Sequence, residues 1–170
     1  MSWEKKPRVA VGAGVSYVGA RQPVIGGGGV VSAVPINILL VEDDTADVLI
    51  TREAFVEHKV RNRLTVLRDG GEALAFLRGD GAGVTDVILL DLDLPTVSGR
   101  EVLAAVRADP VLRRIPVVVL TNSRVEADIL AGQLAGVHSY LLKPVDFDQL
   151  VAVVRHVEEF YISVQRMAPA

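Results

Sequence analysis

Charged and hydroxyl side chains follow four short apolar runs of this 170-residue chain, each at the point where the run ends. They are Glu42, Asp43 and Asp44 after residues 36–41, Asp91 and Asp93 after residues 87–90, Thr121 after residues 115–120, and Lys143 after residues 139–142. If the runs are parallel strands, their carboxyl ends meet at one edge of a sheet, where open α/β proteins bind their ligands. Acids, a hydroxyl group and an amine would then converge on one site.

The chemistry of such a site follows from its charges. Two carboxylates about 4 Å apart repel by roughly 1 to 4 kcal/mol, depending on the local dielectric, so the cluster is expected to bind a cation. Oxygen ligands without His or Cys favour Mg²⁺ or Mn²⁺ over zinc. With a metal and Lys143 balancing the charge and Thr121 donating a hydrogen bond, Asp91 could receive a phosphoryl group. Each residue alone could be a helix cap or a surface residue, but four coincident placements favour a shared site.

The segments between these residues alternate between strand-like and helix-like patterns. We expect strands at residues 36–41, 64–67, 87–90, 115–120 and 139–142, and helices at 45–57, after Asp69, and at 99–107, 126–135 and 147–165. The strand segments hardly alternate between apolar and polar residues, which is typical of strands buried on both faces of a parallel sheet. The predicted fold is therefore α/β, a doubly wound five-stranded parallel sheet with five helices. Arg68 and Asp69, after the second strand, are interpreted as turn residues only, with Asp69 capping the next helix.

The first 35 residues lack a sustained helical or strand period and contain a run of four glycines. Basic residues near the start, followed by the apolar residues 9–20, resemble a secretory signal, but glycines within that stretch disfavour its helix. We predict a flexible Gly-rich leader at residues 1–35 and one domain at residues 36–166, with no output domain after it. No uninterrupted apolar run is long enough to cross a bilayer, so no membrane association is expected.

The composition argues against several classes of protein. The net charge of −3 is opposite to the basic face that nucleic-acid binding usually requires. Cysteine is absent, so neither disulfides nor thiolate metal sites can form. Because disulfides are rare in cytoplasmic proteins, the absence of cysteine fits a cytoplasmic protein, and we expect that location.

The motifs resemble those of response-regulator receiver domains, the CheY-like family with a flavodoxin-like fold. The matching segments, in order along the chain, are ILLVEDD, DGGEALAFLR, VILLDLDLP, GREVL, IPVVVLTNS and YLLKPVDF. They extend over about residues 36–165. The resemblance implies a stand-alone response regulator that accepts a phosphoryl group from a histidine kinase. Such a protein catalyses its own phosphorylation and dephosphorylation and is not a turnover enzyme.

The resemblance also implies a role for each site residue. Asp91 would be the phosphoacceptor, and Lys143 would pair with the phosphoryl group. The metal ligands would be Asp43 and Asp91 directly, the backbone carbonyl of Asp93, and Glu42 through a water molecule. Thr121 and Tyr140 would be the switch residues that respond to phosphorylation.

More narrowly, the chain resembles the single-domain regulators that partner bacterial and cyanobacterial phytochromes. Val145–Phe147 and the aromatic pair Phe160–Tyr161 carry this resemblance. The implied partner is a sensor histidine kinase, with a bacteriophytochrome as the specific candidate. The apolar arc of the last helix is wider than one sheet face can cover. We therefore also predict a homodimer through the last strand and last helix, with Phe160 and Tyr161 in its face.

Three positions depart from the pattern of those relatives. Asp93 stands where they usually have Asn, Asn122 where a smaller residue or Thr is common, and Ser98-Gly99 replaces Asp-Gly. Asp93 and Asn122 border the predicted phosphoryl site. The lifetime of the phosphoryl group therefore cannot be carried over from the family.

Two other interpretations compete with this one. The segment ILLDLDLPT also resembles the first motif of haloacid-dehalogenase-type phosphatases, in which Asp91 would be the nucleophile and Asp93 the general acid. Those enzymes place this motif near the start of the domain, whereas here Glu42 and Asp43 precede it. The other alternative is an interaction module that keeps the fold without phosphorylation, and the complete set of site residues argues against it.

Overall fold

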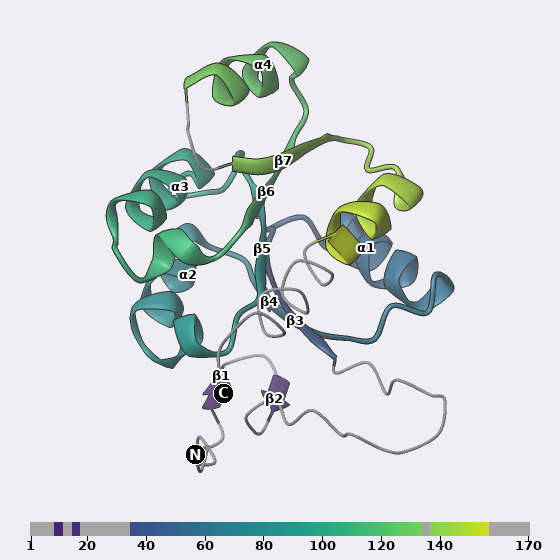
Figure 1. The fold of residues 1–170 in the computed structure, drawn as a ribbon, viewed down its shortest axis with the longest axis horizontal. Coiled ribbons are helices and arrows are strands. Elements are labelled where there is room, and N and C mark those ends of the chain that lie inside the picture. Colours follow the sequence, from purple (N-terminus) through teal and green to yellow (C-terminus); the bar gives the residue numbers. More distant parts are fainter. Residues whose placement is uncertain (1–8, 12–14, 18–34, 134–136, 157–170) are drawn as a thin grey trace, which may run out of the picture.

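The computed structural model describes residues 9–11, 15–17, 35–133 and 137–156 (Figure 1). Its centre is a five-stranded parallel sheet in the order β4-β3-β5-β6-β7. The strands are β3 (Ile36–Val41), β4 (Asn62–Leu67), β5 (Val87–Asp91), β6 (Val117–Thr121) and β7 (Val137–Leu142). The chain winds from β3 to one edge, then returns past β3 to the other, which confirms the predicted doubly wound topology.

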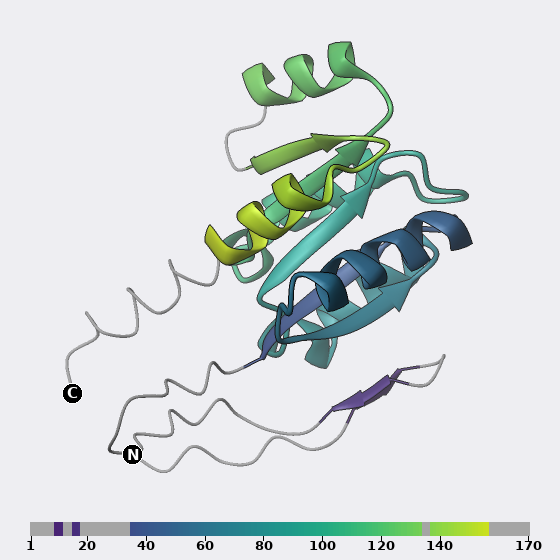
Figure 2. The same cartoon turned by 90° about the vertical axis from the view of Figure 1, so that its right-hand side faces the viewer.

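Helices cover both faces of this sheet. They are α1 (Thr45–Glu57), α2 (Gly70–Arg78), α3 (Gly99–Ala108), α4 (Arg124–Gln133) and a C-terminal helix whose described part is residues 147–156. α1 and the C-terminal helix run across one face, as Figure 2 shows most directly, and α2 and α3 cover the other. α4 contacts β6 and β7 at one edge of the sheet. We call the two sides the α1 face and the α3 face.

Strand residues alternate between two cores because successive side chains of a strand point to opposite faces of the sheet. The core of the α1 face includes the strand residues Ile38, Leu40, Val87, Leu89, Val118 and Leu120. The core of the α3 face includes Leu39, Val41, Ile88, Leu90, Val117 and Val119. Continued by one residue, this alternation directs Glu42 and Asp91 to the α1 face and Thr121 to the α3 face.

Side chains in the loops begin three of the helices. Asp44 caps α1, Asp69 caps α2 and Ser98 caps α3, each by accepting hydrogen bonds from backbone N–H groups of the first turn. The cap at Asp69 was predicted. At α3, the Glu101 carboxylate in turn accepts a hydrogen bond from the Ser98 N–H, so this helix begins with a complete capping box.

Some boundaries differ from the predicted ones. β6 begins at Val117 and not at Ile115, because a 3₁₀ turn (Leu112–Arg114) and Pro116 precede it, and it ends on Thr121. Two short antiparallel strands, β1 (Val9–Val11) and β2 (Val15–Tyr17), lie where no regular structure was predicted. Apart from Pro35, the rest of the predicted leader lies outside the described residues, as do Phe160 and Tyr161. Among the helices of the described part, none is long and apolar enough to span a bilayer.

Candidate functional site

The carboxyl ends of β3 and β5 bring three predicted metal ligands together. Val41 pairs with Leu90 in the sheet, so Glu42 and Asp91 lie side by side one residue further on. One carboxylate oxygen from each of Glu42, Asp43 and Asp91 lies within 4.8 Å of the other two. Glu42 is 1% exposed and Asp91 2%, whereas Asp43 is exposed at the rim.

Lys143, which follows β7, reaches into this acidic cluster. Its ammonium group donates hydrogen bonds to Glu42 at 2.7 Å, to Asp47 at 2.8 Å and to Asp91 at 3.0 Å. The Lys143 side chain is only 8% exposed, so salt and water screen its ion pairs with the buried Glu42 and Asp91 weakly. With Asp43 included, one positive charge faces four carboxylates.

Burial and close hydrogen-bond partners shift the pKa of two groups in this cluster. Burial raises the pKa of Glu42 to about 7, against the opposing hydrogen bonds from Lys143 and the Asp44 backbone, and the charge of Asp91 adds to the rise. Burial alone would lower the pKa of Lys143, but its hydrogen bonds to Asp47, Glu42 and Asp91 outweigh burial and raise that pKa. Lys143 is therefore charged at neutral pH, while the carboxyl group of Glu42, with a pKa of about 7, is partly protonated there.

The donor atoms of the cluster fit a hard divalent cation. They are all oxygens, the ligands that Mg²⁺ and Mn²⁺ prefer. A bound cation would relieve the repulsion between Glu42 and Asp91, and the exposed Asp43 carboxylate is accessible to it. Asp93, whose carbonyl is the further predicted ligand, follows on the loop after β5, and its backbone N–H donates to Asp91 at 3.0 Å.

The two predicted switch residues lie on the α3 face. Thr121 is 0% exposed at the end of β6. Its hydroxyl donates to Glu126 at 3.0 Å and accepts from the Ser123 N–H at 3.1 Å, so its proton is directed to Glu126 and not to Asp91. Tyr140 on β7 is 37% exposed, and because the next residue of β7, Leu141, enters the α1-face core, Tyr140 is on the same face as Thr121.

The loop between β5 and α3 packs tightly against Asp91. A Cβ atom on Gly99 would lie 2.0 Å from the Asp91 carbonyl oxygen, so only glycine fits where α3 begins. Asn122 donates to the Asp93 carboxylate at 3.3 Å, so two of the positions that depart from the family pattern contact each other. Thr96, between β5 and α3, has a φ of 61°, in the left-handed region that β-branched residues avoid.

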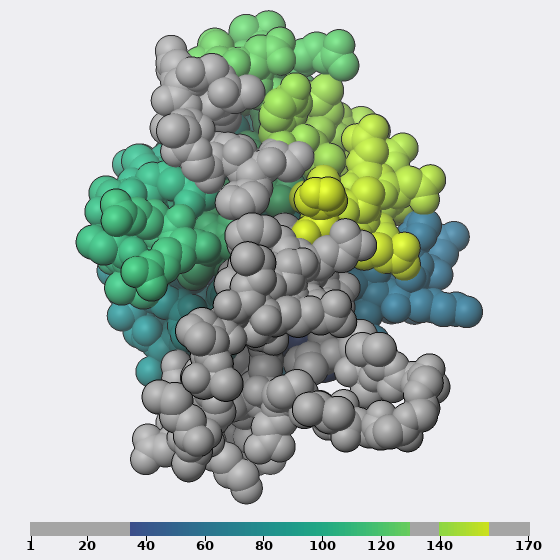
Figure 3. Space-filling model, viewed as in Figure 1, coloured from purple at the N-terminus to yellow at the C-terminus, as the bar shows by residue number. Residues whose placement is uncertain are grey.

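Asp47 contacts the site but was not assigned to it from the sequence. It lies in the first turn of α1, where it binds Lys143. Asp47 and Lys143 also line a pocket whose further walls include Ile50, Thr51, Pro144, Val145 and Phe147. These residues come from α1 and from the segment that leads into the C-terminal helix, two elements that lie next to each other in Figure 3. An acid in the first turn of a helix is favourable to the helix dipole in any protein. Its position in the sequence therefore does not indicate a contact with Lys143.

Arg68 and Glu126 were also missed. Arg68 donates to the backbone carbonyl of Asp43 at 2.8 Å and to the Thr45 hydroxyl at 3.2 Å, so the interpretation of Arg68 as a turn residue only was wrong. No local pattern reveals these contacts, because the partners are 25 and 23 residues away. Glu126 binds Thr121, and the Ser-x-x-Glu spacing that ends on it is a signal of helix capping.

The fold and the site together define a receiver domain, the phosphoryl-accepting module of response regulators. Residues 38–155 match the family model for the response regulator receiver domain. The chain belongs to this family. It is a response regulator, a signalling protein and not a turnover enzyme.

Its relatives include regulators linked to phytochromes. Response regulator Rcp1 of Synechocystis sp. is 40% identical over 140 residues, which are 80% of this chain and 95% of that protein. The structure of the phosphorylated cyanobacterial phytochrome response regulator RcpA is 43% identical, with a TM-score of 0.61 over 77% of this chain and 96% of that one. The bacteriophytochrome response regulator AtBRR is 39% identical, with a TM-score of 0.65 over 73% of this chain and 93% of that one.

One of these relatives has been solved with a metal. The Mn²⁺-bound form of Rcp1 is 42% identical to this chain, with a TM-score of 0.60 over 75% of this chain and 94% of that one. The acidic cluster described above supplies carboxylate oxygens, a kind of ligand that suits Mn²⁺. None of these relatives supports the haloacid-dehalogenase-type interpretation.

Proposed function

We propose that Asp91 accepts a phosphoryl group from a phosphohistidine or a small acyl phosphate. The observation that carries this proposal is the Lys143 ammonium 3.0 Å from the buried Asp91 carboxylate, inside an acidic cluster. A carboxylate oxygen of Asp91 bonds to phosphorus while the bond from phosphorus to the nitrogen or oxygen of the donor breaks. Lys143 then turns from its carboxylate partners to the new phosphoryl oxygens and balances their charge.

The other site residues assist this transfer. The metal ligands would be Asp43 and Asp91 directly, the Asp93 carbonyl, and Glu42 through water. When bound, Mg²⁺ or Mn²⁺ neutralises charge on the phosphoryl oxygens. Thr121 would donate its hydroxyl to one of those oxygens, and Tyr140, on the same face, would move with it. The chain would end the signal by hydrolysing its own acyl phosphate.

Labelling with acetyl phosphate tests the assignment of Asp91. The wild type should gain a single phosphoryl group with Mg²⁺ present and none after chelation, as read from the mass of the intact protein. Asp91→Asn should abolish labelling. The matched control is Asp44→Asn, which removes an equal charge from the exposed cap of α1 and should leave labelling intact. Full labelling of Asp91→Asn would move the acceptor elsewhere.

Metal binding should depend more on Asp43 than on Glu42, because Asp43 is proposed as a direct ligand and Glu42 as a ligand through water. Titration of Mg²⁺ into Asp43→Ala should show the larger loss of affinity, and Glu42→Ala the smaller. Equal and unimpaired affinity in the two variants would remove the proposed metal site.

We further infer that the donor is a sensor histidine kinase, with a phytochrome as the specific candidate. The support is identity of 39% to 43% with RcpA and AtBRR over more than nine tenths of their length. A phosphotransfer screen tests this inference. Purified kinases, labelled on histidine, should transfer to the chain fastest when the kinase is a phytochrome. Faster transfer from unrelated kinases would reject the phytochrome and keep the general function.

Signal output is proposed to pass through a homodimer formed by the last strand and last helix. Tyr140 supports this, because β7 is an edge strand of the sheet and Tyr140 leaves aromatic surface exposed there. Phe160 and Tyr161 complete the proposed dimer face. Sedimentation of the wild type and of the Phe160→Ala, Tyr161→Ala double variant tests it. A wild type that is monomeric at high concentration, with and without phosphorylation, would leave only a partner-binding role for this face.

We propose that residues 36–166 are the functional unit, acting in the cytoplasm, and that residues 1–35 are dispensable for phosphorylation. A chain that begins near Val34 should match the full chain in melting temperature and in labelling of Asp91. A large loss of stability would show instead that the leader packs on the domain.

A further inference from the structure

Both α3 and α4 begin with the sequence Ser-x-x-Glu, but the hydrogen bonds of their first turns differ. At α3, Ser98 and Glu101 exchange hydrogen bonds and complete a capping box. At α4, the Glu126 N–H donates to the Ser123 hydroxyl at 3.2 Å, which is half of the same motif. The other half is not formed, because the Ser123 N–H donates to the Thr121 hydroxyl at 3.1 Å and not to the Glu126 carboxylate.

The Thr121 hydroxyl thus lies between the Ser123 N–H and the Glu126 carboxylate, the two groups that would pair in a complete capping box. It accepts from Ser123 and donates to the Oε2 atom of Glu126 at 3.0 Å. A threonine hydroxyl has one proton to donate. Thr121 therefore cannot donate to a phosphoryl oxygen while it donates to Glu126, and the two acceptors compete for it.

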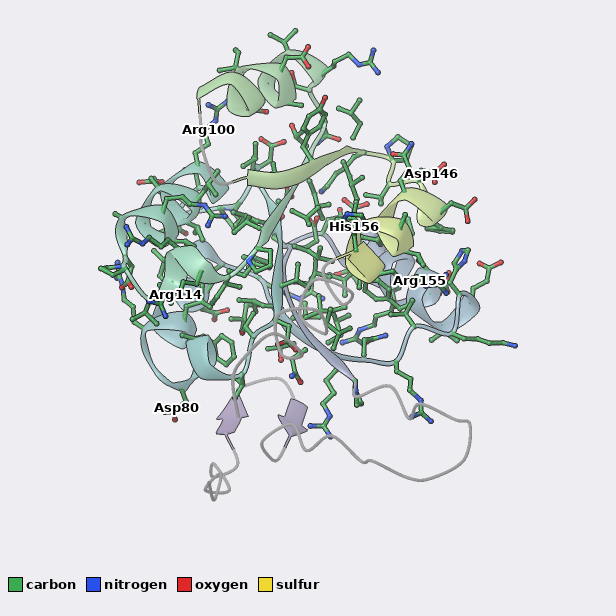
Figure 4. All side chains as sticks on the ribbon, viewed as in Figure 1. Asp80, Arg100, Arg114, Asp146, Arg155 and His156 are labelled. Carbon is green, nitrogen blue, oxygen red and sulfur yellow. The ribbon has the colours of Figure 1, made fainter. Side chains whose placement is uncertain are left out.

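Arg100 holds the other oxygen of Glu126. Its guanidinium group, labelled in Figure 4, reaches from the first turn of α3 to α4 and forms an ion pair with the Oε1 atom of Glu126. Glu126 would therefore keep a charged partner if the Thr121 hydroxyl donated to another acceptor. Its free Oε2 atom could then accept the Ser123 N–H, which would complete the capping box.

We propose that Glu126, anchored by Arg100, is a positioning residue that holds the Thr121 hydroxyl in the unphosphorylated protein, and that phosphorylation closes the α4 capping box. This inference rests on the proposed phosphorylation of Asp91. The Thr121 hydroxyl stops donating to Glu126 and donates to a phosphoryl oxygen. The Ser123 N–H then donates to the Glu126 carboxylate and no longer to the Thr121 hydroxyl. Only hydrogen bonds change. The start of α4 thereby responds directly to the state of Asp91.

Beryllofluoride, which mimics a phosphoryl group on a carboxylate, gives an equilibrium measurement of this competition. Glu126→Ala should bind beryllofluoride with Mg²⁺ about five- to tenfold more tightly than the wild type, because one hydrogen bond to a charged acceptor no longer opposes the bound state. The isosteric Glu126→Gln retains an oxygen acceptor and should give a smaller gain in the same direction. Asp128→Ala removes the same charge from an exposed position of α4 and should bind like the wild type.

A double-mutant cycle separates this role from a general effect on folding. In the Thr121→Ala background, Glu126→Ala should change the affinity for beryllofluoride by less than about twofold, because the competing hydroxyl is gone. The Ser123 amide gives a second measurement by NMR. Its signal should move when beryllofluoride binds to the wild type, and Thr121→Ala alone should move it in the same direction.

The outcomes distinguish this inference from the function on which it rests. A wild type that binds no beryllofluoride in an Asp91-dependent way would reject the proposed function. If it binds, an equal effect of Glu126→Ala in both backgrounds, or weaker binding by Glu126→Ala, would overturn the role of Glu126 and leave the role of Asp91 intact.

Discussion

The Lys143 ammonium lies 2.8 Å from Asp47 and 3.0 Å from Asp91, so the first turn of α1 shares the lysine with the proposed phosphoacceptor. The Asp47 side chain is 37% exposed, whereas that of Asp91 is 3% exposed. Water competes for an exposed carboxylate, and ion pairs with such a partner contribute little. Lys143 can therefore leave Asp47 for a phosphoryl group, but it must break one ion pair to do so.

Asp47→Asn should accelerate the phosphorylation of Asp91. The variant keeps an oxygen acceptor near Lys143 and removes the competing charge, so we expect about a two- to fivefold higher rate, which corresponds to an ion pair of about 0.5 to 1 kcal/mol. The measurement is the rate of labelling by acetyl phosphate at saturating Mg²⁺. Asp44→Asn is the control, since it removes a charge at the start of the same helix without contacting Lys143. An equal acceleration there would assign the effect to net charge alone.

Glu42 should make the stability of the metal-free protein depend on pH. Its pKa is raised from 4.5 to about 7, so between these values the folded state binds more protons than the unfolded state. The stability that Glu42 contributes is therefore fully present below about pH 4.5 and is lost as the pH rises through about 7. Glu42→Gln stays neutral, so relative to the wild type it should gain about 1 to 3 kcal/mol between about pH 5 and pH 8. Urea unfolding at the two pH values measures this gain.

Metal binding supplies the complementary check on Glu42. Protons compete with Mg²⁺ for the Glu42 carboxylate, so the apparent affinity of the wild type should fall as the pH drops below about 7. The same titration of Glu42→Gln should show a weaker dependence on pH. If the two proteins had the same pH dependence in both unfolding and Mg²⁺ titration, the raised pKa of Glu42 would be refuted.

The placement of the main site residues could be predicted because they directly follow strongly apolar runs. Residues 36–41 and 45–57 form a strand and a helix with the predicted boundaries. Two of the three acids after the first run, Glu42 and Asp43, lie beside Asp91, whereas Asp44 caps the helix. Burial of the strands on both faces specifies a parallel sheet, and the topology of that sheet brings the carboxyl ends of the strands to one edge. These inferences need only local patterns and general rules of topology.

The choice of partner for each side chain could not be predicted in this way. Lys143 is 96 residues from Asp47, and their contact depends on how α1 packs beside the loop after β7. The spacing of Ser123 and Glu126 predicts a reciprocal capping box, but the buried hydroxyl of Thr121 interrupts it. The local sequence therefore contains the capping motif, but the contact with Thr121 changes which hydrogen bonds form.

Arg68→Ala should destabilise the loop that carries the acidic pair. Arg68 ties the end of β4 to the backbone of Asp43 and to Thr45. Since this side chain is exposed and its partners are neutral, we expect a loss of about 0.5 to 1.5 kcal/mol in the free energy of unfolding. Arg52→Ala, at an exposed position on α1, should change it by no more than about 0.5 kcal/mol. Urea unfolding compares the two variants.

The affinity of Arg68→Ala for Mg²⁺ separates loop order from charge. Loss of a positive charge would strengthen Mg²⁺ binding, whereas loss of order around Asp43 would weaken it. At about 1 M ionic strength the Debye length is about 3 Å, so the charge effect is largely screened. We expect the affinity of the variant to fall below that of the wild type under those conditions. A gain in affinity at low salt that vanishes at high salt, with no fall below the wild type, would show that Arg68 acts through its charge alone.

Thr96→Asn should stabilise the protein. Thr96 has a φ of 61° in the loop after β5, and a β-branched side chain in the left-handed region is strained, whereas Asn tolerates it. Relief of part of that strain should add about 0.5 to 1 kcal/mol to the free energy of unfolding. Lys59, with a φ of 53°, is the matched comparison, and because it is unbranched at Cβ, Lys59→Asn should gain less. Urea unfolding ranks the two variants, and equal or lower stability of Thr96→Asn would show that the loop holds Thr96 without strain.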